Sequence, residues 1–262
     1  MSSPRRSGGA HRLPILAYHD IGISPSPLSV SPDRFLQHMS GLHQAGWRCL
    51  SLDDLSAGRT LGAWPTRSVV LTFDDGLASF AEHALPVLVR FGFPAILFAV
   101  SGRLGRLPDW PGWPADLPRR LLDAGALAEA ASEGIEIGAH SVSHRPFTHL
   151  DLDDVTREIL DSRAQLEDLL GRRVRSFAYP YGDAPPSSIR VVRGNFDAGF
   201  GIRLAFVTPR SRPEIYERID AYYLRQWPRL TWLDIGVARA WLRLRATARR
   251  ARLIVHGGYG PG

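Results

Sequence analysis

Short apolar runs alternate with longer amphipathic runs along most of this chain. Runs rich in branched and aromatic residues predict strands at Leu13–Tyr18, Ser68–Phe73, Ala95–Val100, Ile135–Ala139, Ser176–Tyr179 and Leu204–Val207. Helical spacing predicts helices at Phe35–Ala45, Ala81–Phe91, Leu117–Glu133 and Asp151–Leu170. Because the strand runs are almost continuously apolar, both faces of the sheet should be covered, which is typical of an α/β fold with parallel strands.

Two segments do not fit this alternation. The segment Gly102–Pro118 is rich in Pro and Gly and contains Trp110 and Trp113, which predicts a surface excursion or a substrate rim. The segment Arg239–Arg252 holds six arginines with Trp241 and two leucines between them, and it predicts a basic helix. We therefore divide the chain into a flexible N-terminal segment (1–12), one barrel domain (13–236) and a basic helical tail (237–262).

Composition narrows the chemistry that the chain can support. The 262 residues are 44% hydrophobic and 22% charged, which is ordinary for a globular protein. The single cysteine, Cys49, excludes an internal disulfide and a cysteine-rich zinc module, so any metal must use His, Asp or Glu. No apolar run reaches the about 18 residues of a membrane span or forms the core of a secretory signal. We expect a cytoplasmic protein or one at the inner membrane surface.

The charge balance is unusual because all 32 basic residues are arginine, and the net charge is +6. An excess of positive charge favours anionic partners such as a membrane surface, an acidic glycan or a nucleic acid. A general preference for arginine codons would produce the same composition. The segment 239–252 could lie on an anionic membrane as a basic amphipathic helix, or cap the barrel as a solvated one.

Polar side chains follow several predicted strands at the point where each strand ends. His19 follows the first strand, Asp74 and Asp75 follow the second, and His140 and His144 follow Ile135–Ala139. Because the carboxyl ends of parallel barrel strands share one face, these clusters should converge on one mouth.

The paired residues suggest a metal site with a separate base. Two histidines four residues apart can face one point, and with one carboxylate they leave a coordination position open, as in catalytic zinc sites. A second, adjacent carboxylate could then act as a general base. The alternatives are a chance spacing among nine histidines and a solvated Asp-Asp-Gly turn.

Three motifs in order resemble those of the polysaccharide deacetylases (carbohydrate esterase family four, the NodB-homology domain). They are Thr72-Phe73-Asp74-Asp75-Gly76, His140-Ser141-Val142-Ser143-His144 and Phe177-Ala178-Tyr179-Pro180-Tyr181-Gly182. The opening Pro14-Ile15-Leu16-Ala17-Tyr18-His19-Asp20-Ile21 resembles the circularly permuted branch that acts on poly-N-acetylglucosamine. The likeness covers roughly Leu13 to Leu224, and it implies a deformed (β/α) barrel of about seven parallel strands.

The resemblance also implies a role for each motif residue. Asp75, His140 and His144 would hold a divalent metal, with Zn²⁺ foremost and Co²⁺, Ni²⁺ or Fe²⁺ as alternatives. Asp74 would be the general base and His19 the general acid. The backbone N–H of Tyr181 would stabilise the oxyanion. The implied reaction is removal of acetyl groups from the N-acetylated amino sugars of a polysaccharide or glycan substrate.

The sequence departs from the family pattern at several positions. Ala178 stands where many members carry the arginine that orients the base, and Arg218 is a candidate substitute. His256 is a second candidate for the acid, less favoured than His19 because of its place near the chain end. Trp110, Trp113 and Trp227 could stack on sugar rings or pack in the core or rim.

Three alternative functions remain open at this stage. They are a non-catalytic glycan-binding relative, an O-acetyl esterase and an arginine-driven nucleic-acid binder. Nucleic acid is the least favoured partner, because it would leave the two acids and two histidines without a role.

Overall fold

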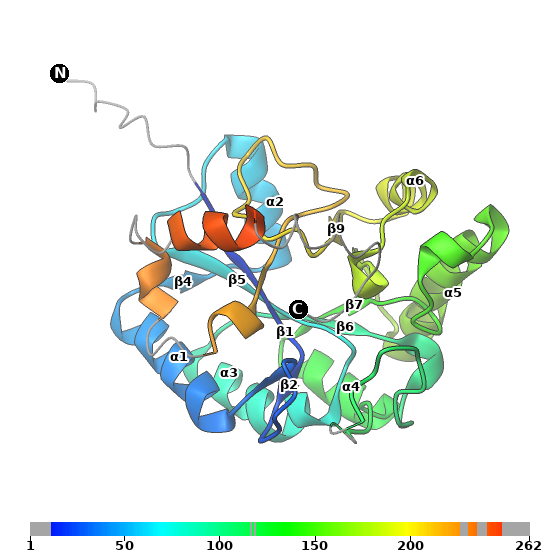
Figure 1. Ribbon diagram of the computed structural model, residues 1–262, viewed down its shortest axis with the longest axis horizontal. Coiled ribbons are helices and arrows are strands. Elements are labelled where there is room, and N and C mark those ends of the chain that lie inside the picture. The colour runs from blue at the N-terminus through cyan, green and yellow to red at the C-terminus, as the bar shows by residue number, and fades with distance from the viewer. Residues whose placement is uncertain (1–11, 116, 118, 226–229, 235–239, 248–262) are drawn as a thin grey trace.

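The computed structural model describes residues 12–115, 117, 119–225, 230–234 and 240–247. Its strands are Ile15–Tyr18 (β1), Asp20–Ile21 (β2), Ser29–Val30 (β3), Arg48–Cys49 (β4), Ser68–Phe73 (β5), Ile96–Ala99 (β6), Glu136–Ala139 (β7), Ser176–Ala178 (β8), Ala198–Phe200 (β9) and Ile219–Asp220 (β10). Seven of them form a parallel sheet in the order β10-β1-β5-β6-β7-β8-β9, and β4 pairs with the first half of β5. The sheet curls into a deformed barrel (Figure 1), which confirms the predicted fold class.

The helices lie outside the curled sheet (Figure 1). They are Pro32–Gln44 (α1), Leu52–Leu61 (α2), Leu85–Phe91 (α3), Ala124–Ser132 (α4), Leu152–Leu170 (α5) and Pro186–Asn195 (α6). Helix α1 begins at Pro32, three residues before the predicted Phe35, because the Ser31 hydroxyl accepts the backbone N–H of Arg34 and caps the helix. Side chains on both faces of the sheet are buried, as in β5, where all six residues are buried. This burial explains the unbroken apolar runs in the sequence.

The segment 213–218 closes the gap between the two edge strands, β9 and β10. The Gly199 N–H donates to the Pro213 carbonyl at 2.7 Å, and the Tyr216 N–H donates to the Gly199 carbonyl at 2.7 Å. Tyr216 also forms a parallel bridge with Phe200. The closing segment approaches β9 so closely that a Cβ on Gly199 would lie 2.1 Å from the Glu214 carbonyl oxygen. Glycine is therefore required at this point of closure.

Two predicted elements are wrong. The predicted strand Leu204–Val207 is irregular, with only Val207 in an isolated bridge to Leu13, and the strand forms instead at Ala198–Phe200. The predicted helix Leu117–Glu133 begins only at Ala124, where the Asp123 side chain accepts the N–H of Ala126. Just before it, Leu121 forms an isolated antiparallel bridge with Leu77, and the Leu122 N–H donates to the Gly76 carbonyl, so these two residues are not helical.

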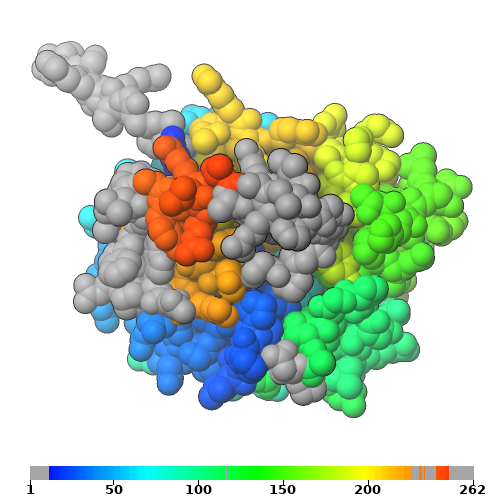
Figure 2. Space-filling model, in the orientation of Figure 1, coloured from blue at the N-terminus to red at the C-terminus, as the bar shows by residue number. Residues whose placement is uncertain are grey.

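The C-terminal region is described only in part. Residues 240–247 are helical, and Leu242 is buried in the same core as Leu230 and Leu233. Figure 2 shows this helix in red beside the orange residues that precede it. The rest of the predicted tail and residues 1–11 lie outside the described residues, so the division into three parts stays a prediction. Among the described helices, none has the length and apolar character that crossing a membrane requires.

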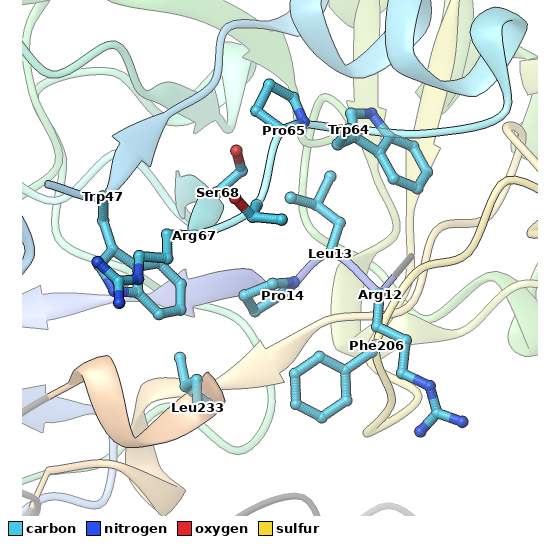
Figure 3. A pocket seen from close by; sticks show the side chains of 11 residues that line it. Arg12, Leu13, Pro14, Trp47, Trp64, Pro65, Arg67, Ser68, Phe206 and Leu233 are labelled. Carbon is cyan, nitrogen blue, oxygen red and sulfur yellow. The ribbon is translucent and has the colours of Figure 1, made fainter. Parts of the chain in front are cut away.

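A small cavity of about 130 Å³ lies at the amino ends of β1 and β5. In Figure 3, Leu13 and Pro14 lie between Trp47 and Trp64, and Phe206 and Leu233 line the opposite side. The described residues that line it include neither a carboxylate nor a histidine. The polar clusters of the sequence follow the carboxyl ends of the same strands, so the cavity lies at the wrong end of the sheet for the predicted chemistry.

We expect Gly199→Ala to lower the free energy of unfolding by about 1–3 kcal/mol, because the added methyl group would force the closing segment away from β9. Gly194→Ala is the matched control, since a Cβ there meets nothing within 4 Å. It should be neutral or stabilise by up to about 1 kcal/mol, because alanine favours the helix. Urea unfolding of both variants measures the difference. Equal stabilities would contradict the tight closure.

Candidate metal and catalytic site

The strand register brings the predicted site residues to one edge of the sheet. Tyr18 lies opposite Phe73, so His19 and Asp74 leave neighbouring strands at the same level. Further along the sheet, Ala139 of β7 lies opposite Phe177 of β8, so His140 emerges beside the end of β8. Parallel strands with aligned carboxyl ends thus collect side chains that are far apart in the sequence.

Asp75, His140 and His144 form a buried cluster whose potential ligand atoms all lie within 4.8 Å of one another. The Nε2 atoms of His140 and His144 lie 3.4 Å and 3.3 Å from Asp75 Oδ1. Two ligands of one tetrahedral Zn²⁺, each about 2.0–2.1 Å from the ion, are separated by about 3.3 Å. The three side chains therefore fit a shared divalent cation.

Neighbouring groups orient this donor set for metal binding. His140 Nδ1 lies 2.7 Å from the Ala178 carbonyl oxygen, so it carries the proton and leaves Nε2 free to face Asp75. Burial acts to raise the pKa of Asp75, but its contacts with His140 and His144 hold that pKa well below the usual value. The carboxylate is therefore ionised at neutral pH, as a metal ligand must be.

Asp74 lies outside this cluster and pairs with Arg218. The guanidinium donates from Nη1 to Asp74 Oδ1 at 2.6 Å and from Nη2 to Oδ2 at 2.8 Å. Both side chains are buried, at 1% and 4% exposure. Burial acts to raise the pKa of Asp74, and Arg218 outweighs it, so the pKa lies below its usual value. In the family that the motifs resemble, many members carry an arginine at the position of Ala178, and that arginine orients the base. Here Arg218 contacts Asp74, the carboxylate expected to be the base.

His19 lies on the open side of Asp74. Its Nε2 atom is 3.8 Å from Asp74 Oδ2, and its side chain is 17% exposed. His19 is thus within reach of both the carboxylate and solvent. His256, the second candidate for the acid, lies outside the described residues. So does Trp227, the third tryptophan that could stack on a sugar ring.

Backbone strain is concentrated at this site. Five non-glycine residues among those described have a positive φ, and four of them belong to the motif loops: Asp75 (69°), Ser141 (64°), His144 (58°) and Tyr181 (57°). Such conformations cost of order 1 kcal/mol or more each, and they persist where the surroundings over-determine them. The strained turns direct Asp75 and His144 toward a common point.

Within the predicted excursion 102–118, Trp110 and Pro111 contact the residues of the site. The Trp110 ring packs on the His144 ring with centroids 4.4 Å apart, and Trp110 is buried. The Tyr181 ring lies 4.6 Å from His144, and its hydroxyl donates to the Pro111 carbonyl at 2.8 Å. For both Trp110 and Trp113 the sequence predicts either stacking on sugar rings or packing in the core or rim. Trp110 packs in the core, whereas Trp113 is only half-buried. Sequence reasoning did not identify these contacts with His144.

A glutamate on α5 is a further residue that the sequence gave no reason to select. Glu158 accepts hydrogen bonds from the backbone of the loop that carries His144. Glu158 lies sixteen positions after Val142 in the sequence, and no local sequence pattern predicts a contact between a helical glutamate and a loop at that distance.

The polysaccharide deacetylase family model matches residues 62–195, which include the Asp-Asp, His-x-x-x-His and Tyr-Pro-Tyr-Gly motifs. Among curated proteins, YxkH of Bacillus subtilis is 28% identical over 172 residues, covering 65% of this chain and 57% of that protein. The poly-β-1,6-N-acetyl-D-glucosamine N-deacetylase of Staphylococcus epidermidis is 24% identical over 215 residues, covering 76% of this chain and 72% of that protein.

Solved structures share the fold. IcaB from Ammonifex degensii superimposes with a TM-score of 0.72 at 25% identity, covering 84% of this chain and 97% of that one. The Streptococcus pyogenes deacetylase PplD, solved with acetate, superimposes with a TM-score of 0.71 at 24% identity, covering 81% of this chain and 93% of that one. The deformed barrel, the three motifs and the family match over half of the sequence place this chain in the polysaccharide deacetylase family.

Proposed function

We propose that this protein is a metal-dependent carbohydrate N-deacetylase, a hydrolase that releases acetate from the N-acetylated amino sugars of a polysaccharide. The observation that carries the proposal is a buried Asp-His-His cluster beside a separate carboxylate, Asp74, which is already oriented by Arg218. The names of the staphylococcal relatives support a polymer of N-acetylglucosamine as the substrate class.

Asp75, His140 and His144 would hold the divalent cation. Their carboxylate and imidazole donors suit Zn²⁺ foremost, and Co²⁺, Ni²⁺ or Fe²⁺ as alternatives. When bound, such a cation supplies Lewis acidity, which lowers the pKa of a coordinated water and polarises the acetamide carbonyl.

Asp74 would accept the proton of the attacking water. Its lowered pKa keeps it ionised at neutral pH, and Arg218 occupies only one acceptor direction of each carboxylate oxygen. Lone pairs therefore remain to accept the proton. The bidentate contact with Arg218 fixes the carboxylate plane, so the base does not reorient during the reaction.

His19 would protonate the leaving amine. An amine is a poor leaving group unless it is protonated, and an acid close to the base can return the proton. The Nε2 atom of His19 lies 3.8 Å from Asp74 Oδ2, so the two groups can act on one scissile amide bond, Asp74 on the attacking water and His19 on the leaving nitrogen. The backbone N–H of Tyr181 would stabilise the oxyanion, which forms beside the strained turn at that residue.

Acetate release from N-acetylglucosamine oligomers tests the proposal. We expect turnover that is lost with a chelator and restored by Zn²⁺ or Co²⁺. Asp74→Asn should lower kcat by about 10²–10⁴-fold while bound metal is retained, because Asp74 is not one of the three ligands. The matched control Asp33→Asn changes an exposed aspartate in the first turn of α1 and should leave kcat unchanged.

Two outcomes would contradict the N-deacetylase assignment. Acetate release only from O-acetylated glycans would point to an O-acetyl esterase. Metal binding and glycan binding without release of acetate from any glycan would identify a non-catalytic relative.

The Arg218–Asp74 pair should also contribute to stability. Arg218→Met leaves the Asp74 carboxylate buried without its partner, which should lower the free energy of unfolding by about 3–5 kcal/mol. The double variant Arg218→Met/Asp74→Leu removes both charges and should recover part of that loss. A double-mutant cycle in urea measures the coupling. Additive effects of the two substitutions would contradict a direct pair.

Glu158 clamps the loop between the two metal-ligand histidines. Its Oε2 atom accepts the Val142 and Ser143 N–H groups at 3.0 Å and 2.9 Å, and its Oε1 accepts the Ser143 hydroxyl at 2.5 Å. The Ser141 hydroxyl in turn accepts the His144 N–H at 2.9 Å. These bonds hold His144 in its strained conformation, so Glu158 is a positioning residue for the metal site.

Glu158→Ala should therefore lower metal affinity by about 10–100-fold, as expected when a partner that orients a ligand is removed. Chelator competition measures the affinity without reference to activity, and Glu158→Gln should restore part of it because the amide oxygen still accepts a hydrogen bond. Asp161→Asn, an exposed change on the same helix, is the control. Unchanged metal affinity in Glu158→Ala would contradict the clamp.

A further inference from the structure

A large cleft adjoins the metal and catalytic site where the chain leaves β9. Its volume is about 710 Å³, within the range of about 300–1,000 Å³ that is typical of ligand sites. Its lining includes Gly182, which follows Tyr181, and Glu217, which precedes Arg218. The Gly201 carbonyl at its edge accepts the Nε–H of Arg218 at 2.8 Å. The cleft thus shares its backbone with the groups that hold Asp74.

The lining combines a cationic rim with an apolar floor. Three exposed arginines belong to it, and among the described lining residues Glu217 is the only acidic one. The apolar and hydroxyl-bearing lining residues include Ile202, Leu204, Thr208, Ser211, Ile215 and Tyr216. The segment 201–212 lies along the upper edge of the face in Figure 2, in yellow to gold. A sugar ring presents matching chemistry, with C–H groups on its faces and hydroxyl groups at its edge.

Positive charge in this cleft exceeds the acidic groups available to neutralise it. Glu217 forms an ion pair with Arg203. Glu214, just behind the lining, is shared between Arg212 and Arg193, which both donate to its Oε1 atom. No acidic group of the described residues pairs with Arg210. At least one guanidinium is thus left to face a ligand.

We propose that this cleft is an accessory subsite that binds an anionic group, a carboxylate or a phosphate, on a sugar near the one that is deacetylated. The inference rests on the proposed deacetylase function and narrows its substrate class to an acidic N-acetylated glycan. The planar guanidinium of Arg210 matches the geometry of both anions and can donate two parallel hydrogen bonds. The positive charges of Arg203 and Arg212 also attract an anion to the rim, while these arginines keep their ion pairs with Glu217 and Glu214.

Binding of oligogalacturonate tests the subsite separately from catalysis, because this carboxylate oligomer has no N-acetyl group to release. We expect calorimetric titration of the metal-loaded protein to show binding that weakens about tenfold in Arg210→Gln and further in Arg210→Glu. A phosphorylated mannan oligosaccharide forms the second arm. The arm that depends on Arg210 identifies which anion the subsite accepts.

Arg48→Gln is the matched control for general attraction to a basic protein. Arg48 is exposed on β4, at the amino end of the sheet, and no described acidic residue pairs with its side chain. This variant should bind oligogalacturonate as the wild type does. The proposal fails if neither oligomer binds, if Arg210→Gln binds as tightly as the wild type, or if Arg48→Gln weakens binding equally.

A competition assay connects the subsite to the reaction. Oligogalacturonate should raise the KM of the wild type for N-acetylglucosamine oligomers and leave kcat unchanged, because both ligands would use adjoining parts of one groove. Unchanged KM at saturating oligogalacturonate would overturn the placement of the subsite. Arg210-dependent binding without acetate release from any glycan would instead refute the deacetylase function and leave the anion site standing.

Discussion

The bidentate contact between Arg218 and Asp74 is the interaction on which the rest of this structure depends. It joins the end of β5 to the segment that closes the barrel, and both partners are almost fully buried. A buried charge is tolerated only when it is paired and hydrogen-bonded, and Arg218 is further satisfied by the Thr72 hydroxyl and the Gly201 carbonyl. Closure of the fold and orientation of the proposed base are therefore one structural event.

Around this pair, the family's motifs occupy strained turns at the carboxyl ends of parallel strands. The strain at Asp75 and His144 is sustained by contacts from outside the motifs, namely Glu158 on α5 and the rings of Trp110 and Tyr181. Strain that the surroundings maintain keeps the donor set in place before a ligand arrives. A deacetylase with this architecture would not have to rearrange its metal ligands when the substrate binds.

The use of arginine for every Lys or Arg position has a structural consequence at the cleft beside this site, where three arginines belong to the lining. Most of the described arginines are exposed, where solvent and salt screen their charge. The cleft differs because three exposed guanidinium groups line one concave surface, where the proposed subsite would bind an anionic glycan. For residues 239–252 the sequence allows either a membrane-surface helix or a helix that caps the barrel, and the described helix 240–247 packs Leu242 into the core.

The sequence by itself determined five central strands (β1, β5, β6, β7 and β8), the α/β class and the Asp-Asp and His-x-x-x-His positions, because apolar runs and strand-end motifs are local signals. It missed β9 and β10, which are only three and two residues long and exist because neighbouring strands pair with them. It suggested Arg218 only by resemblance, since no local pattern links that residue to Asp74 across 144 positions. Tertiary structure alone decided the contacts of Glu158 and the cleft lined by Arg203, Arg210 and Arg212, because both depend on how loops fold back on one another and no local sequence pattern marks such contacts.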